Sequence, residues 1–295
     1  RGIKNETEVE GFRKAHIRDG VAMVRFLRWL DENWARGLTE IEAVKQLEAF
    51  RAEDDALQDI SFDTISGSGP NGAIIHYRVS EASDRTMRKG ELFLVDSGGQ
   101  YLDGTTDITR TVAIGRPADE IRRRFTLVLK GHIALDQAKF PAGTTGTQLD
   151  VLARQFLWNE GLDYDHGTGH GVGAFLSVHE GPQRIAKQWN GHALKPGMVL
   201  SNEPGFYKDG CYGLRCENLV VVREHEANTD DGPPMMSFEA LTLAPFDLRL
   251  LEPSLLTPPE AVWIDSYHER VFRELSPRLQ EQDAAWLRQA TLPIA

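Results

Sequence analysis

The 295-residue sequence lacks the features of a secreted, membrane-spanning or nucleic-acid-binding protein. Its only two cysteines, Cys211 and Cys216, have no second pair and no nearby histidine, so they support neither a disulfide framework nor a zinc knuckle, and we expect free thiols. No apolar run reaches the roughly 18 to 20 residues that span a bilayer. Positive charge is scarce: 33 Lys and Arg against 44 Asp and Glu give a net charge of -11, which disfavours binding to phosphate backbones. We therefore predict a cytoplasmic protein that binds neither nucleic acid nor membranes.

The composition is that of a globular protein. Hydrophobic residues make up 41% and charged residues 26%, and a chain of this length buries most of its unfolded surface without disulfides. The first residue is Arg1 rather than Met, so we expect amino-terminal domains of a longer protein to be missing here. We predict one main domain over residues 1–235 and an extension over 236–295 that packs on it.

The element pattern predicts an α+β fold. Thr7 with Glu10 and Thr39 with Glu42 form capping boxes at the starts of two helices within the first 55 residues. Strands follow at AIIHY, ELFLVD and TDITRTVAI, then two helices that begin at Pro117 and near residue 147, then a second glycine-rich strand group. The two halves therefore share one plan, and we expect helices on one face of a curved, mostly antiparallel sheet. Two terminal helices with aromatic residues complete the chain.

Two aspartates give the first sign of chemistry. Asp96 ends the apolar strand FLVD, and Asp107 follows 11 residues later in TDITRT, a spacing that lets adjacent antiparallel strands bring both carboxylates together. Two neighbouring carboxylates repel each other unless they share a proton or bind a cation. A cation is the simpler solution.

The second half supplies three further ligand types: His170 in GTGHGVG, Glu203 in SNEPG and Glu217 in LRCENL. Together the five residues offer four carboxylates and one imidazole. Four negative charges balance two divalent ions bridged by hydroxide. Oxygen-rich ligands favour Mn²⁺, although Co²⁺, Fe²⁺ or Zn²⁺ fits the same cage.

Six motifs in this order, LVDSGGQY, TDITRT, HGTGHGVG, VHEGP, NEPGFY and RCENL, resemble those of the pita-bread metallopeptidases. The resemblance is strongest to the Xaa-Pro aminopeptidase (aminopeptidase P) family of soluble three-domain enzymes. It implies a pita-bread fold with two pseudo-symmetric halves, a homodimer, and two missing leading domains. It also implies that Asp107 and Glu217 bridge two metals. By the same resemblance Asp96 completes one metal site, and His170 with Glu203 completes the other.

The implied reaction is hydrolysis of the amino-terminal Xaa-Pro bond of peptides by a metal-bridging hydroxide. Glu203 is the candidate that accepts the proton of the water and passes it to the leaving nitrogen. His76 and His179 resemble the histidines of the family that stabilise the carbonyl oxygen and the tetrahedral intermediate. Arg215 resembles an arginine that orients the ligand carboxylates.

Three alternatives remain open. A prolidase cleaves Xaa-Pro dipeptides with the same ligand set. A non-catalytic pita-bread module binds proteins, but it is expected to have lost ligands, and this sequence retains all five. A creatinase-like, metal-free use of the fold is disfavoured by the complete carboxylate set.

The remaining histidines have less specific surroundings. We expect His132 to pack within a helix, and we expect His166 to support the site. The other four histidines have no ligand-like neighbours and are expected on the solvated surface: His16, His192, His225 and His268. The glycines of HGTGHGVG lack the context of a nucleotide loop, so we interpret them as positions of close backbone contact.

Overall fold

Strands and helices alternate in the order that the sequence predicts. The computed structural model describes residues 1–225 and 231–294. Its first half contains helices α1 and α2, followed by strands β1 to β6: α1 Glu6–Asn33, α2 Glu40–Ala52, β1 Leu57–Ile60, β2 Ile65–Ser68, β3 Leu92–Ser97, β4 Gly99–Tyr101, β5 Gly104–Thr105 and β6 Ile108–Ala113. Short 3-10 helices cover Trp34–Arg36 and Gly69–Ala73.

The second half has a similar plan: two helices, separated by the short strand β7, precede its other strands, and two more helices follow. Its elements are α3 Asp119–Asp136, β7 Phe140–Pro141, α4 Gly146–Trp158, β8 Gly169–His170, β9 Arg184–Ile185, β10 Val199–Asn202, β11 Gly205–Lys208, β12 Tyr212–Arg215, β13 Asn218–Glu224, β14 Met235–Ala240, α5 Pro258–Leu275 and α6 Glu281–Ala290. Short 3-10 helices cover Leu248–Leu250, Pro253–Leu255 and Ser276–Arg278.

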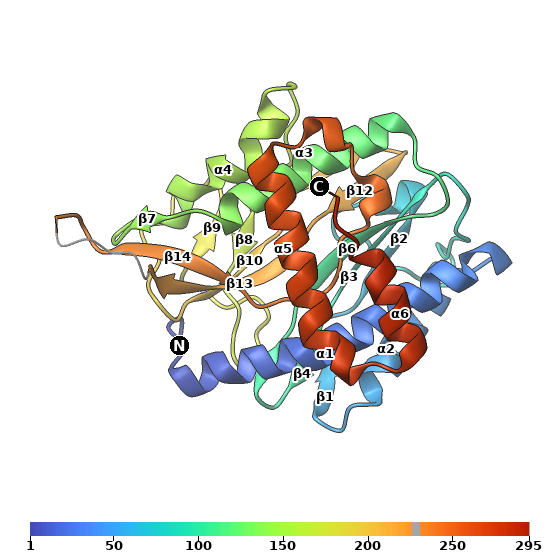
Figure 1. The fold of residues 1–295 in the computed structure, drawn as a ribbon, viewed down its shortest axis with the longest axis horizontal. Coiled ribbons are helices and arrows are strands. Elements are labelled where there is room, and N and C mark those ends of the chain that lie inside the picture. The colour runs from blue at the N-terminus through green and yellow to red at the C-terminus, as the bar shows by residue number, and fades with distance from the viewer. Residues whose placement is uncertain (226–230, 295) are drawn as a thin grey trace.

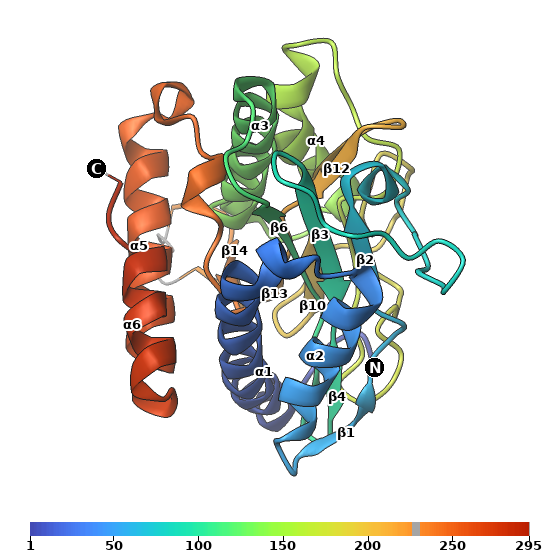
Figure 2. The same ribbon diagram turned by 90° about the vertical axis from the view of Figure 1, so that its right-hand side faces the viewer.

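Antiparallel pairing joins all the described strands of the sheets. The strand orders β2-β3-β6 and β10-β13-β14-β7 carry the two halves, and smaller sheets pair β1-β4-β5, β11-β12 and β8-β9. In Figure 2 the helices form layers beside these strands: α1 and α3 lie next to them, and α5 and α6 form the outer layer. The predicted α+β class with a mostly antiparallel sheet is confirmed.

Capping sets the helix starts, and in three places it differs from the prediction. Helix α1 begins at Glu6 because Asn5 and Glu8 form the capping box, not Thr7 and Glu10. Helix α2 uses Thr39 as predicted. Helix α3 begins at Asp119, so Pro117 precedes the helix instead of opening it. Helix α4 is capped by Thr145, two residues before the predicted start near Thr147.

The segment AIIHY is not a strand, which corrects the prediction. The chain forms the 3-10 helix Gly69–Ala73 and then a loop that contains His76. Tyr77 is buried in this loop, whereas Ile74 is 55% exposed. The β-branched pair Ile74–Ile75 therefore does not form a strand pairing.

The carboxy-terminal extension packs against the body. Helix α5 lies in front of α1 and α3 in Figure 1, and α6 runs beside it. Trp263, Phe272 and Trp286 pack on a cluster of buried residues that includes Phe125, as expected for core aromatic residues. No helix in the described part of the chain is long and apolar enough to cross a bilayer. Both cysteines are free thiols, as predicted.

Candidate metal centre

The five predicted ligands line one pocket. Asp107, His170 and Glu217 each offer a ligand atom within 4.8 Å of the others. His170 Nε2 lies 3.3 Å from Asp107 Oδ2 and 3.4 Å from Glu203 Oε1. Asp96 and Glu203 line the same pocket, a cavity of about 680 Å³. Three further predicted site residues also line it: His76, His179 and Arg215.

Strand pairing brings the aspartates together. Strand β3 pairs with β6 so that Asp96 lies opposite Thr109, and Asp107 immediately precedes β6. The backbone N–H of Glu217 donates to Thr109 O at 3.3 Å and joins the second half to the same strand. The predicted pairing of adjacent antiparallel strands is confirmed.

Close backbone contact around His170 explains the glycines of HGTGHGVG. A Cβ on Gly169 would lie 2.0 Å from Ser201 O, and a Cβ on Gly171 would lie 2.0 Å from Glu180 O. Only glycine permits this approach of the β8 backbone to its neighbours. The interpretation of these glycines as crowded backbone positions is confirmed.

Burial and mutual repulsion perturb the carboxylates. Burial raises the pKa of Asp96 to about 6 although Arg215 opposes the rise, and burial raises the pKa of Glu203 to about 7. Burial and then the charge of Asp107 raise the pKa of Glu217 well above its usual range. Such shifts are what burial and neighbouring like charges produce in carboxylic acids.

The imidazole of His170 presents one ring nitrogen to the carboxylates. His170 Nδ1 donates to Gly171 O at 2.9 Å, which leaves Nε2 facing the carboxylates. The carboxylates around it raise the pKa of His170 to about 9 against the effect of burial. Asp96 Oδ1 is buried, and no hydrogen-bond partner for it lies within the described chain. The donor set therefore fits divalent cations.

Arg215 contacts the ligand set on two sides. Its Nη2 donates to Asp96 Oδ2 at 2.7 Å, and its Nε donates to Thr109 Oγ1 at 3.1 Å. Thr109 Oγ1 in turn donates to Glu217 Oε2 at 2.6 Å. The sequence reasoning missed Thr109, although it lies within the quoted motif TDITRT.

His166 belongs to this network through Tyr207, which the sequence reasoning also missed. Burial lowers the pKa of His166 to about 3, so the ring is neutral. Its Nδ1 donates to Gly167 O at 2.8 Å, and its Nε2 accepts from Tyr207 Oη at 2.8 Å. Arg215 Nη1 donates to the same Tyr207 oxygen at 2.6 Å. His166 therefore contacts the site through Tyr207, in keeping with the expected supporting position.

The two predicted oxygen-stabilising histidines differ in their surroundings. The ring of His179 lies edge-on to His170, with centroids 4.2 Å apart. Burial and the charge of His170 lower the pKa of His179. His76 is exposed in the loop after the 3-10 helix and lines the pocket.

The histidines outside the site only partly match the expectations. His132 is buried and its Nδ1 donates to Asn202 O, as predicted for a packed helix residue. His192 is exposed as expected, whereas His225 is half-buried. The surface prediction is wrong for His16 and His268. Both rings are buried, and each makes one hydrogen bond with the backbone: His16 Nδ1 donates to Phe12 O, and His268 Nε2 accepts from Phe246 N.

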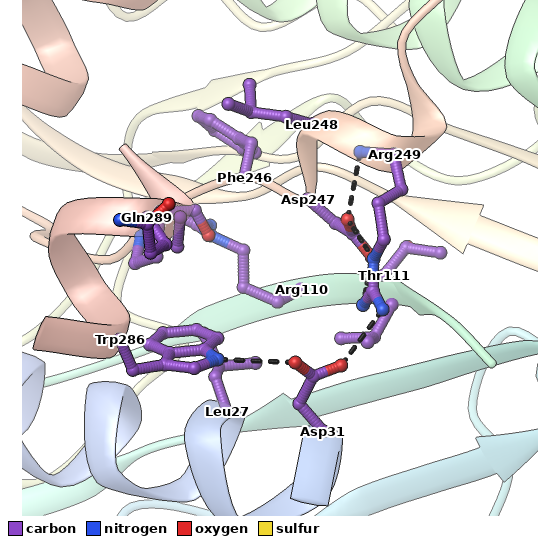
Figure 3. A pocket seen from close by; sticks show the side chains of 13 residues that line it. Leu27, Asp31, Arg110, Thr111, Phe246, Asp247, Leu248, Arg249, Trp286 and Gln289 are labelled. Atoms are coloured by element: carbon purple, nitrogen blue, oxygen red, sulfur yellow. Dashed lines mark hydrogen bonds and ion pairs between the residues drawn. The ribbon is translucent and has the colours of Figure 1, made fainter. Parts of the chain in front are cut away.

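A second cavity, of about 270 Å³, lies between α1, β6 and α6. Figure 3 shows Asp31 in its wall between two donors: Trp286 Nε1 at 3.3 Å and Arg249 Nη1 at 2.9 Å. Arg110 also lines it, and the Nη1 of Arg110 donates to Glu217 O at 2.6 Å. In this wall Arg249 pairs with both Asp31 and Asp247.

The chain belongs to metallopeptidase family M24. The family profile matches residues 10–224, and the profile of the carboxy-terminal region of these peptidases matches residues 234–294. The pita-bread fold predicted from the motifs is therefore confirmed.

Its relatives include Xaa-Pro aminopeptidases. A probable Xaa-Pro aminopeptidase P of Laccaria bicolor is 50% identical over 301 residues, which cover 100% of this chain and 47% of the relative. The X-prolyl aminopeptidase of Caenorhabditis elegans, described as a cytosolic enzyme with a di-nuclear active site, is 42% identical with a TM-score of 0.95 and covers 99% of this chain and 49% of its own. A prolidase of Thermococcus sibiricus is 30% identical with a TM-score of 0.67, over 84% of this chain and 62% of its own. The chain spans about half the length of the curated relatives it matches.

Proposed function

We propose that the chain is the catalytic region of a dinuclear metal-dependent aminopeptidase that hydrolyses the amino-terminal Xaa-Pro bond of peptides. The observation that carries this proposal is the convergence of Asp107, His170 and Glu217 within 4.8 Å, beside the further acids Asp96 and Glu203. The likeness to Xaa-Pro aminopeptidases over the full length of the chain supports the substrate class.

Five residues would hold two divalent ions, and their oxygen-rich donor set favours Mn²⁺ over thiolate-preferring metals. These are Asp96, Asp107, His170, Glu203 and Glu217. When bound, such ions lower the pKa of water and polarise a carbonyl oxygen.

The side chains around these ligands have distinct parts in the reaction. Glu203 accepts a proton from the attacking water and donates it to the proline nitrogen that leaves. Its carboxylate is oriented by Ser201 Oγ, which donates to Glu203 Oε1 at 2.9 Å. His76 and His179 donate hydrogen bonds to the carbonyl oxygen as it gains negative charge. Arg215 fixes the orientation of Asp96.

The substrate is a peptide with proline at its second position, and the cavity of about 680 Å³ has room for several residues. We further infer a homodimer in the cytoplasm. The catalytic domain extends over residues 1–235, residues 236–295 form its extension, and further domains precede it in the whole protein.

A prolidase activity on Xaa-Pro dipeptides is the second candidate, favoured by the likeness to the Thermococcus sibiricus prolidase. The two differ in the length of the peptide that they cleave. With Mn²⁺ present, we expect cleavage of an Xaa-Pro-Xaa tripeptide at a rate at least comparable with that of the Xaa-Pro dipeptide. Cleavage of the dipeptide alone would replace the aminopeptidase proposal with the prolidase one.

Replacement of Glu203 tests the mechanism. Glu203→Gln removes the proton acceptor while keeping the shape of the side chain, so we expect kcat to fall by at least about 100-fold. The matched control is Asp165→Asn, which changes a carboxylate of the same pocket outside the ligand cluster and should leave kcat within about twofold. Circular dichroism should show the same fold for both variants, and retained hydrolysis by Glu203→Gln would refute the assigned role.

A further inference from the structure

A buried glutamate outside the metal centre holds the loop that carries His76. Glu40 is the first residue of α2 and is 0% exposed. Its carboxylate accepts hydrogen bonds from Ser68 N at 2.6 Å, Asn71 Nδ2 at 3.0 Å and Tyr77 Oη at 2.9 Å. The backbone N–H of Arg85 also donates to it, at 3.2 Å. All four donors belong to the segment 68–85, so one side chain ties together residues far apart along this loop.

The loop fixes His76 through the residues around it. The ring of His76 makes no hydrogen bond with the described part of the chain, and Ile74, two residues earlier, is 55% exposed. The anchored residues on either side are Asn71 and Tyr77, and both donate to Glu40. Tyr77 directly follows His76, is 5% exposed and also contacts Ser83 of the same loop. Glu40 is thus a residue outside the loop that binds side chains on both sides of His76, and the position of His76 depends in part on these contacts.

The backbone contacts of α2 reinforce this connection. The N–H of Glu40 donates to Arg85 O at 3.1 Å, and Ser66 Oγ donates to Glu40 O at 2.9 Å. The Arg85 end of the segment, and Ser66 two residues before its other end, are thereby joined to the first turn of α2. A carboxylate suits this place because it only accepts, whereas a glutamine would present an NH₂ group to several donors.

We propose that Glu40 is a positioning residue for the reaction: its carboxylate holds the segment 68–85 so that His76 stays at the substrate pocket. The inference rests on the proposed function, in which His76 stabilises the carbonyl oxygen. Glu40 lines neither the pocket nor the metal cluster, and it acts through the loop.

The test compares Glu40→Gln with Glu48→Gln in the full chain loaded with Mn²⁺. Glu48 lies on the same helix, and from the described residues it accepts a single long hydrogen bond, from Thr64 Oγ1 at 3.4 Å. Because a misplacement of about 1 Å costs about 100-fold in rate, Glu40→Gln should lower kcat on an Xaa-Pro tripeptide by up to about that factor, with little change in KM. Glu48→Gln should keep kcat within about twofold.

A double-mutant cycle separates positioning from general destabilisation. In a His76→Ala background, Glu40→Gln should lower kcat by no more than about threefold further, because its route to the reaction is gone. An equal loss of kcat in both backgrounds, or an unchanged kcat in Glu40→Gln alone, would overturn the proposal. If Glu40→Gln does not fold, Tyr77→Phe removes one donor and should lower kcat about fivefold, again only when His76 is present.

Amide hydrogen exchange provides a readout that does not depend on catalysis. Exchange over residues 68–85 should accelerate in Glu40→Gln and stay unchanged in Glu48→Gln. If the parent chain cleaves no Xaa-Pro peptide, the proposed function fails. Exchange then decides the positioning claim by itself, since an unchanged loop in Glu40→Gln would overturn it.

Discussion

The pocket of the candidate ligands and the cavity beside α6 differ in how their carboxylates are surrounded. Thr109 of β6 contacts Glu217 of the first pocket, while Arg110, the next residue of the strand, lines the second cavity. In the second cavity Asp31 is paired with Arg249 and Trp286. In the first pocket burial and like charge raise the pKa of Asp96, Glu203 and Glu217. Paired groups join the extension to the body, whereas the raised pKa values mark carboxylates that crowd one another.

Removal of a ligand carboxylate should give the largest difference between the cavities. We expect Asp107→Asn to lower kcat/KM by about 1000-fold or more, because metal binding supplies several kcal/mol of transition-state stabilisation. The matched change in the second cavity, Asp31→Asn, should leave kcat/KM within about twofold. Steady-state kinetics with Mn²⁺ measure both. Comparable losses in the two variants would contradict the assignment.

The pH dependence of stability should reveal the uncompensated charges. Asp96 and Glu203 have pKa values of about 6 and about 7 in the folded chain without metal, above those of unfolded carboxyl groups. The folded state then binds more protons than the unfolded state, so stability falls as pH rises from about 4 to 7.

We expect Asp96 and Glu203 to contribute a drop of a few kcal/mol to the free energy of unfolding of the metal-free chain across this range. Urea denaturation of the parent chain and of Glu203→Gln at each pH measures it, because the difference between the two isolates the contribution of Glu203. Glu203→Gln should lose less stability than the parent chain as pH rises, and saturating Mn²⁺ should remove this difference because cations stabilise the ionised carboxylates. The same pH dependence in both metal-free chains would contradict the charge account.

The hydroxyl of Thr109 should have a smaller effect on the same centre. Thr109→Val removes the donor to Glu217 Oε2 and the acceptor for Arg215 Nε while keeping the side-chain volume. Loss of such a supporting contact lowers metal affinity about 10-fold to 100-fold. Titration with Mn²⁺ measures the affinity. The control is Thr291→Val, at the residue that follows α6, whose hydroxyl donates to Leu287 O. Equal Mn²⁺ affinities in the two variants would contradict a supporting role of Thr109 at the metal centre.

The smallest effect should come from the second cavity. Asp31→Asn weakens a partly exposed contact with Arg249, so we expect a loss of about 1 kcal/mol in the free energy of unfolding. Chemical denaturation at saturating Mn²⁺ measures it. A loss of free energy of unfolding larger than that of Asp19→Asn, which breaks the buried Asp19–Arg51 pair, would contradict the view that Asp31 makes a weak surface contact with the extension.

The sequence reveals the candidate ligands more readily than the residues that contact them. Asp96, Asp107 and Glu217 stand out because each is an acidic residue within one of the ordered motifs. Thr109 and Tyr207 occur inside two of those motifs, yet their contacts depend on strands that meet only in the folded chain. Hydroxyl contacts of this kind leave no spacing signal.

Local competition explains the wrong predictions. Asn5 and Thr7 each have a glutamate three residues later, and the earlier pair caps α1. The strand expected at AIIHY gives way to a loop whose hydrogen bonds lead to Glu40, which is distant in sequence. His268 is buried because a backbone N–H reaches its ring, a contact that no pattern along the helix reveals.

The central claim is that five residues hold two divalent ions. The most direct measurement is an anomalous-difference map from a crystal soaked in Mn²⁺. We predict two peaks, both bounded by the proposed ligands: Asp96, Asp107, His170, Glu203 and Glu217. The absence of any peak there, or peaks only at other carboxylates, would contradict the account.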